Sequence, residues 1–163
     1  MTIRLTTLLT LSLALPAWAG QNPSTPPTPA ATFRAECAAC HIPYPARLLP
    51  AESWRALMAG LPSHFGTNAA LDAPTASVIE RFLVANASMR PVRSSAADSR
   101  PGAGPVLRIT ETRWFLKEHR EVPARKWVSP EVKSKANCAA CHTGADRGNF
   151  DDGESGSGGG RRP

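Results

Sequence analysis

The first half of the chain carries hydrophobic residues at helical spacing in three short segments. A helix is predicted over 33–41, and the two prolines that follow it cannot continue a helix. A second helix is predicted over 50–58, with Gly60 as its stop. A third is predicted from the N-cap Asp72, with Pro74 in its first turn. The apolar positions are Trp54, Leu57 and Met58 in the second segment and Val78, Ile79, Phe82 and Leu83 in the third.

The second half has weaker periodicity but two helix starts. Thr110 is a candidate N-cap for a helix that places Glu111 in its first turn and continues to about Arg120. Another helix is predicted from Ser129, with Pro130 at its first position, and runs into the cysteine-containing segment that follows. Neither half shows an alternation of period two that would predict a strand. The pattern therefore predicts an all-α fold.

Composition divides the chain into two compact units with poorly hydrophobic segments around them. Pro, Thr, Ser and Ala dominate the segment after the N-terminal leader, Ser, Ala, Gly and Pro dominate the middle break, and the C-terminal tail is rich in Gly and Ser. The predicted organisation is a signal peptide over 1–19, a disordered spacer over 20–32, a first domain over 33–92, a linker over 93–104, a second domain over 105–150 and a disordered tail over 151–163.

The N-terminal leader has the features of a secretory signal peptide. Arg4 precedes a mostly apolar run over 5–15, and the small residues of 17–19 offer a cleavage site. The apolar run is too short to span a bilayer, for which about 20 residues are needed. We therefore expect cleavage after Ala19, a periplasmic mature protein and no transmembrane segment in the mature chain.

Composition limits what can form the core. Sixteen prolines, twelve glycines and only ten aromatic residues leave little material for a conventional interior, and small domains of this kind usually rely on a disulfide, a metal or a cofactor. The formal net charge is +6, but the lysines and arginines are scattered and no nucleic-acid motif accompanies them. Nucleic acid is therefore not expected as a partner.

All four cysteines fall in two copies of one pentapeptide, C-A-A-C-H, at 37–41 and 138–142. C-x-x-C-H is the attachment signature of haem c. On a helical turn the two thiols lie on one face and can add to the two vinyl groups of a porphyrin, while the adjacent histidine reaches the iron. The motifs predict two covalently bound haem c groups, held through Cys37, Cys40 and His41 and through Cys138, Cys141 and His142.

Three other readings of these cysteines are weaker. A disulfide across two intervening residues closes a tiny loop and constrains the unfolded chain little. A thioredoxin-type redox motif would need a βαβ pattern, which the chain lacks, and would not predict a following histidine twice. Zinc accepts Cys and His ligands, but two such motifs about a hundred residues apart do not match the usual spacing of a zinc finger.

The count of histidines predicts the axial ligands of the irons. The chain has four histidines, two of which belong to the attachment motifs, so His64 and His119 remain for the two open axial positions. Methionine is the competing ligand. Met58 shares a helical side with core residues, and Met89 lies near the linker. The second unit contains no methionine, so its haem must use His119, use a less common ligand such as lysine, or be five-coordinate. The arithmetic favours two bis-histidine irons ligated by His41, His64, His119 and His142, closed to substrate.

The chain resembles the small periplasmic dihaem cytochrome c family of purple bacteria. The resemblance rests on the segments 36–41, 52–55, 60–66, 109–118 and 137–142. It implies a first domain like a class I cytochrome c, a small irregular helical second domain that also binds haem, and the ligand pairs His41/His64 and His119/His142. It also implies electron delivery to an oxygen-binding monohaem cytochrome c, with a membrane b-type cytochrome as a neighbour.

The function expected from these features is electron transfer at low potential, without enzymatic activity. Two imidazoles favour ferric iron more than a His/Met pair does. One alternative is a small haem enzyme of the peroxidase or reductase type, which would need an open iron site. Another is a dihaem electron-transfer subunit of the nitrate-reductase type, whose attached and free histidines alternate in a different order from the one in this chain.

The sequence leaves two pairings of the spare histidines open. Each can serve the haem of its own unit, or His64 and His119 can cross between the units. Proximity in the sequence favours local pairing, because a flexible linker at 93–104 lets each unit fold around its own haem.

Overall fold

The computed structural model describes residues 26–89, here the first half, and residues 104–150, the second half. The predicted signal peptide, residues 20–25 of the predicted spacer, residues 93–103 of the predicted linker and the predicted tail lie outside the described residues. Within the described ranges the chain is helical and has no strand, so the predicted all-α fold is confirmed. None of the helices in these ranges is long and apolar enough to cross a membrane.

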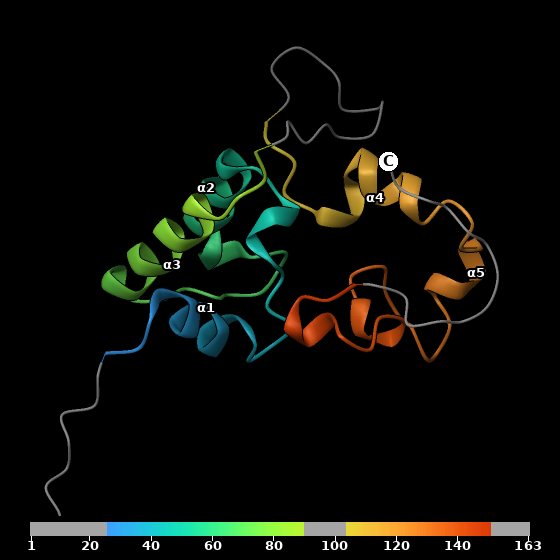
Figure 1. Ribbon diagram of the computed structural model, residues 1–163, viewed down its shortest axis with the longest axis horizontal. Coiled ribbons are helices and arrows are strands. Elements are labelled where there is room, and N and C mark those ends of the chain that lie inside the picture. The colour runs from blue at the N-terminus through green and yellow to red at the C-terminus, as the bar shows by residue number, and fades with distance from the viewer. Residues whose placement is uncertain (1–25, 90–103, 151–163) are drawn as a thin grey trace, which may run out of the picture.

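The two halves lie beside each other (Figure 1). The first half contains three α-helices, α1 (Pro29–Cys37), α2 (Ala51–Ala59) and α3 (Ala73–Ala85). The second half contains the short helices α4 (Arg113–Glu118) and α5 (Ala124–Trp127), joined by irregular chain. Single 3₁₀ turns complete both halves, at Ala46–Leu48, Leu61–Ser63, Ile109–Glu111, Cys138–Ala140 and Ala145–Arg147.

Helix α1 begins four residues before the predicted start, inside the segment expected to be a disordered spacer. Thr28 is its N-cap, and the Thr28 hydroxyl accepts a hydrogen bond from the Ala31 amide at 3.2 Å. Pro29 occupies the first helical position, where its missing amide proton costs nothing. The prediction was wrong here because it began at the first aromatic residue, Phe33, rather than at this capping sequence.

Both ends of α2 and the start of α3 lie within one or two residues of their predicted positions. Pro50 is the N-cap of α2 and Gly60 its C-cap. In α3 the Asp72 carboxylate accepts the Thr75 amide hydrogen bond at 3.0 Å, and Pro74 lies in the first turn. Local capping chemistry therefore determines both boundaries.

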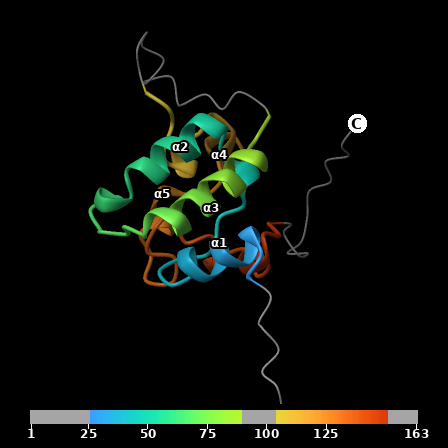
Figure 2. The same cartoon turned by 90° about the vertical axis from the view of Figure 1, so that its left-hand side faces the viewer.

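Helix α3 contacts both α1 and α2 and closes the core of the first half (Figure 2). The buried hydrophobic cluster consists of Phe33, Ala46, Leu49, Trp54, Leu57, Ile79 and Leu83. The Trp54 indole donates a hydrogen bond to the Ala46 carbonyl at 2.7 Å, which satisfies its polar edge inside this cluster. Of the four apolar positions predicted on α3, Ile79 and Leu83 belong to this cluster and Phe82 packs against it.

The cap of α3 predicts a measurable pH dependence. Hydrogen bonds from the Thr75 amide and hydroxyl hold the pKa of the Asp72 carboxyl below its ordinary value of 3.8. Because the pKa of Asp72 is lower in the folded than in the unfolded state, the ionised carboxylate stabilises the folded protein. This stabilisation is complete above the ordinary pKa and is lost as the pH falls through the folded-state pKa. In Asp72→Asn the cap still accepts a hydrogen bond but does not titrate. Acid unfolding curves of the two proteins should therefore converge or cross as the pH falls below that value, and parallel curves would contradict the prediction.

Helix α4 begins two residues later than predicted. Its N-cap is Thr112, not Thr110, and the Thr112 hydroxyl accepts the Phe115 amide hydrogen bond at 3.2 Å. The same hydroxyl donates to the Ile109 carbonyl at 2.7 Å, and the Thr112 side chain is fully buried. The preceding residues, including Thr110 and Glu111, form the 3₁₀ turn. Both threonines are suitable caps in sequence, and burial of Thr112 decides between them.

The helix predicted from Ser129 into the second attachment motif is wrong. Turns occupy this segment, and Lys133 has a left-handed backbone with φ of +66°, which ends any helix there. The Asn137 side-chain amide donates to the Val132 carbonyl at 3.0 Å, and Val132 is almost completely buried. A tight turn that buries Val132 therefore replaces the predicted helix. The short helix α5 was not predicted.

Several contacts join the two halves. The Arg47 guanidinium donates to the Gly148 carbonyl at 2.7 Å, and the Arg108 guanidinium lies 4.0 Å above the Phe65 ring. Gly148 has a φ of +76°, and a Cβ there would meet the Pro45 side chain at 3.1 Å, so both backbone conformation and space favour glycine. The two halves are therefore in direct contact through their side chains.

Candidate functional site

The first site contains His41 and His64. His41 follows the end of α1, and His64 is the C-cap of the 3₁₀ turn Leu61–Ser63. The His64 carbonyl accepts the Thr67 amide at 3.0 Å, and the positive φ values of Phe65 and Gly66, +49° and +94°, turn the loop sharply after the histidine. The two imidazole centroids lie 6.2 Å apart, with 25° between the ring planes.

The second site contains His119 and His142. His119 is the C-cap of α4, and His142 follows the 3₁₀ turn Cys138–Ala140. Their ring centroids lie 6.1 Å apart, and the ring planes are nearly perpendicular at 88°. The structure therefore brings together the two histidines of each half, the arrangement that local pairing predicts.

Both pairs have a spacing that suits one metal ion between the rings. An imidazole nitrogen binds a metal at about 2 Å, so two rings on opposite sides of one metal have centroids roughly 6 Å apart. Zinc fits these sites poorly, because a structural zinc site needs four protein ligands. No cluster of three or more His, Cys, Asp or Glu side chains with metal-binding geometry occurs in residues 26–89 and 104–150. The residues therefore fit a haem iron, which needs two axial ligands.

Backbone carbonyls orient one histidine of each pair. His41 Nδ1 lies 2.6 Å from the Ile42 carbonyl, and His119 Nδ1 lies 2.9 Å from the Phe115 carbonyl. Because a carbonyl only accepts, Nδ1 carries the proton in both contacts and Nε2 keeps its lone pair for a metal. The pKa of His64 is lowered by burial and by the nearby His41 and Arg108, which favours the neutral ring that a ligand requires.

No disulfide joins any of the four cysteines, and each motif has one half-buried and one exposed cysteine side chain. Burial, with a smaller effect of Glu36, raises the pKa of Cys37 to about 11, and burial also raises the pKa of Cys138. Reactive redox C-x-x-C pairs have a lowered cysteine pKa instead. These thiols are therefore unlike those of a thioredoxin-type site.

Aromatic and apolar side chains surround His119. The Phe115 ring stacks on it at 4.1 Å between centroids, and the Trp127 ring lies 5.7 Å away. An open cavity of about 360 Å³ adjoins His119 and is lined by residues of α4, of α5 and of the chain that joins them, together with Val128 and Lys135. Phe150 contacts the edge of His142 at 5.6 Å. An apolar group that extends beyond the histidine pair would find nonpolar contacts here.

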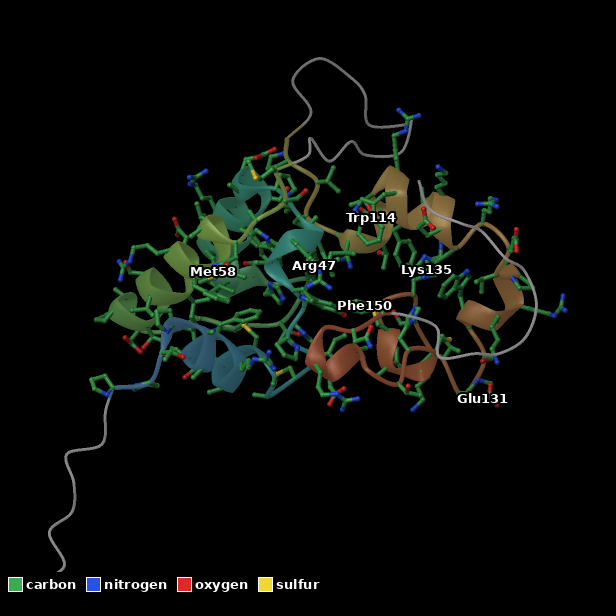
Figure 3. All side chains as sticks on the ribbon, viewed as in Figure 1. Arg47, Met58, Trp114, Glu131, Lys135 and Phe150 are labelled. Atoms are coloured by element: carbon green, nitrogen blue, oxygen red, sulfur yellow. The ribbon has the colours of Figure 1, made fainter. Side chains whose placement is uncertain are left out.

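The two methionines of the described residues have other surroundings. Met58 packs against the hydrophobic core of the first half, and Met89 is fully exposed. Figure 3 shows Met58 among the side chains of the first half, and Arg47 and Phe150 toward the middle of the molecule. The side chain that faces His41 is therefore the imidazole of His64 and not the thioether of Met58.

Tyr44 connects the two sites, a role for which the sequence gives no signal. Its ring stacks on His41 at 4.9 Å, and its hydroxyl donates to the Ala136 carbonyl at 2.6 Å, two residues before Cys138. Burial, followed by the effect of Cys138, raises the pKa of Tyr44 to about 12, so the hydroxyl remains a donor at neutral pH. The segment around Tyr44 signalled only the end of a helix, and a partner 92 residues away leaves no local pattern.

Replacement of Tyr44 by phenylalanine should loosen the contact between the halves. The variant keeps the ring on His41 but loses the hydrogen bond, which corresponds to about 1 kcal/mol of unfolding free energy. Denaturant unfolding of the mature haem-loaded protein measures this loss. Tyr44→Leu, which also removes the stacked ring, should lose more, and equal stability of wild type and Tyr44→Phe would contradict the assigned role of the hydroxyl.

Comparison with known proteins gives one consistent result. The family model described as dihaem cytochrome c matches residues 33–150. The solved structure of a protein called DHC from Rhodobacter sphaeroides is 45% identical and covers 73% of this chain and 95% of its own, with a TM-score of 0.59. A diheme cytochrome c structure from the same organism is 46% identical and covers 73% of this chain and 94% of its own, with a TM-score of 0.62. A diheme cytochrome c from Shewanella baltica is 39% identical and covers 76% of this chain and 88% of its own, with a TM-score of 0.63. No curated protein matches the chain.

Proposed function

This chain belongs to the dihaem cytochrome c family and is an electron-transfer haem protein, and we propose that both of its irons are ligated by two histidines and work at low potential. The cofactors are two covalently bound haem c groups. Haem iron supplies the chemistry by exchanging one electron between its ferric and ferrous states. The protein supplies attachment, axial ligands and a nonpolar environment.

We assign attachment to the cysteines of the two motifs and axial ligation to the four histidines. The first haem is held through Cys37 and Cys40 with His41 and His64 as ligands. The second is held through the equivalent residues Cys138, Cys141, His142 and His119. The observation that carries this assignment is the spacing of the histidine rings, 6.2 Å in the first site and 6.1 Å in the second. Two protein ligands on each iron leave no open position for a substrate, which supports an electron carrier rather than an enzyme.

Low potential follows from the proposed ligands. Imidazole donates to ferric iron better than a thioether does, so a second histidine in place of methionine lowers the reduction potential. The position of Met58 against the core and the full exposure of Met89 support histidine as the ligand. Nonpolar side chains around His119 raise the potential relative to an exposed bis-histidine haem, which makes the final value a balance of both effects.

We further propose a periplasmic location and protein partners. The leader over 1–19 supports export, and covalent haem attachment suits a protein that matures outside the cytoplasm. By resemblance, the partners are an oxygen-binding monohaem cytochrome c as electron acceptor and a membrane b-type cytochrome as neighbour. Co-purification with each candidate, together with the rate at which the reduced protein passes electrons to the monohaem cytochrome, tests this part of the proposal.

Mass and optical spectra test the haem assignment. Protein expressed with a c-type maturation system should have the mass of the cleaved chain plus two haems, and should keep both during acid-acetone extraction. Oxidised protein should show low-spin spectra without the long-wavelength band of methionine bound to ferric iron. Extractable haem would overturn covalent attachment, and the methionine band would overturn bis-histidine ligation.

A further inference from the structure

The two histidine pairs have nearly equal spacing but very different ring orientations. In the first site the planes of His41 and His64 differ by 25°. In the second site the planes of His119 and His142 differ by 88°. A metal between each pair would therefore meet two nearly parallel rings in one site and two crossed rings in the other.

Neighbouring groups hold the near-parallel rings of the first site. Tyr44 stacks on His41 with 28° between the planes, and the Ile42 carbonyl accepts the Nδ1 proton of His41 at 2.6 Å. On the other side, Phe65 lies 4.8 Å from His64, and the Arg108 guanidinium covers the Phe65 ring. Each ring therefore has an aromatic neighbour that restricts its rotation.

Different neighbours hold the crossed rings of the second site. Phe115 stacks on His119 with only 22° between the planes, and the Phe115 carbonyl accepts the Nδ1 proton of the same ring. Phe115 is 4% exposed, so its own ring has little room to turn. His142 meets the Phe150 ring edge-on, at 75°. Two phenylalanines, one on each side, thus fix the crossed arrangement.

We propose that this difference makes the two haem irons electronically distinct, and that Phe115 and Phe150 are the positioning residues responsible. The proposal rests on the bis-histidine ligation proposed above. Two iron d orbitals can accept electron density from the π systems of the imidazoles. Parallel imidazoles both donate into the same one of these orbitals, which separates the two orbitals in energy. Crossed imidazoles donate into one orbital each, which leaves the two orbital energies nearly equal. Ferric low-spin iron is stabilised by that separation, so crossing the rings favours the ferrous state and raises the potential of the second haem.

Electron paramagnetic resonance of the frozen oxidised protein tests the orientations. The first haem should give a rhombic low-spin signal with three resolved g values, and the second a strongly anisotropic signal with a large maximum g value. Phe115→Leu and Phe150→Leu each release one ring of the second site. Each variant should shift the anisotropic signal toward the rhombic form, lower the potential of that haem and leave the first signal unchanged.

Phe33→Leu is the matched control, because Phe33 is buried in the first core and contacts Phe82 rather than a histidine. It should change neither signal. Two rhombic signals in the wild type, or an anisotropic signal that both second-site variants leave unchanged, would overturn the inference. In both of these outcomes the haem irons would still be low-spin. Failure of the bis-histidine proposal itself would instead appear as a high-spin signal or a methionine band in the optical spectrum.

Discussion

His119→Ala is expected to open the second haem to carbon monoxide while the first haem remains closed. The imidazole of His119 is the only histidine ring within about 6 Å of His142 in the described residues, so its removal leaves one iron with a vacant axial position. A five-coordinate haem becomes high-spin and binds carbon monoxide when reduced. About half of the Soret band should shift on addition of carbon monoxide, against no shift in the wild type.

His64→Ala is the matched variant in the first half. It should open only the first haem, because His64 faces His41 at 6.2 Å. Assignment of the open haem in each variant comes from the two resonance signals described above. If His64→Ala instead perturbs the second haem, the ligands cross between the halves and the local pairing is wrong. If neither variant binds carbon monoxide, both histidines lose their proposed roles.

Replacement of both Cys138 and Cys141 by alanine is expected to remove one haem and unfold most of 104–150. The only buried hydrophobic residues in that range are Phe115, Val132 and Ala145, and its two α-helices have six and four residues. Helices shorter than about 12 residues are marginal without tertiary packing. Limited proteolysis followed by mass spectrometry should show cleavage within this range that is faster by on the order of tenfold or more.

The matched variant replaces Cys37 and Cys40 by alanine. The first half has helices of nine, nine and thirteen residues packed around a continuous hydrophobic cluster. It should keep much of its helical circular dichroism and its resistance to protease after losing its haem. Equal resistance of both halves in both variants would contradict the inference that the second half depends more on its cofactor.

The amino-acid sequence alone determined the cofactor, the helical class and much of the first half. These features depend on local patterns: two C-x-x-C-H motifs, a capping aspartate followed by proline at the start of α3, and apolar positions spaced for one helix face. Such signals act over four or five residues, and the structure therefore places α2 and α3 where the sequence predicts them. The histidine count pointed to the same four residues that the structure brings together in pairs.

Only the tertiary structure decided the second half and the geometry of the sites. Thr110 and Thr112 are equivalent caps in sequence, and burial selects Thr112. The predicted helix after Ser129 gives way to turns because the chain buries Val132 there. The bridge from Tyr44 to Ala136 and the 88° crossing of the second-site rings join groups far apart in the sequence or depend on side-chain packing around them. No local pattern encodes such contacts, because they arise only when side chains from distant parts of the chain meet in the folded protein.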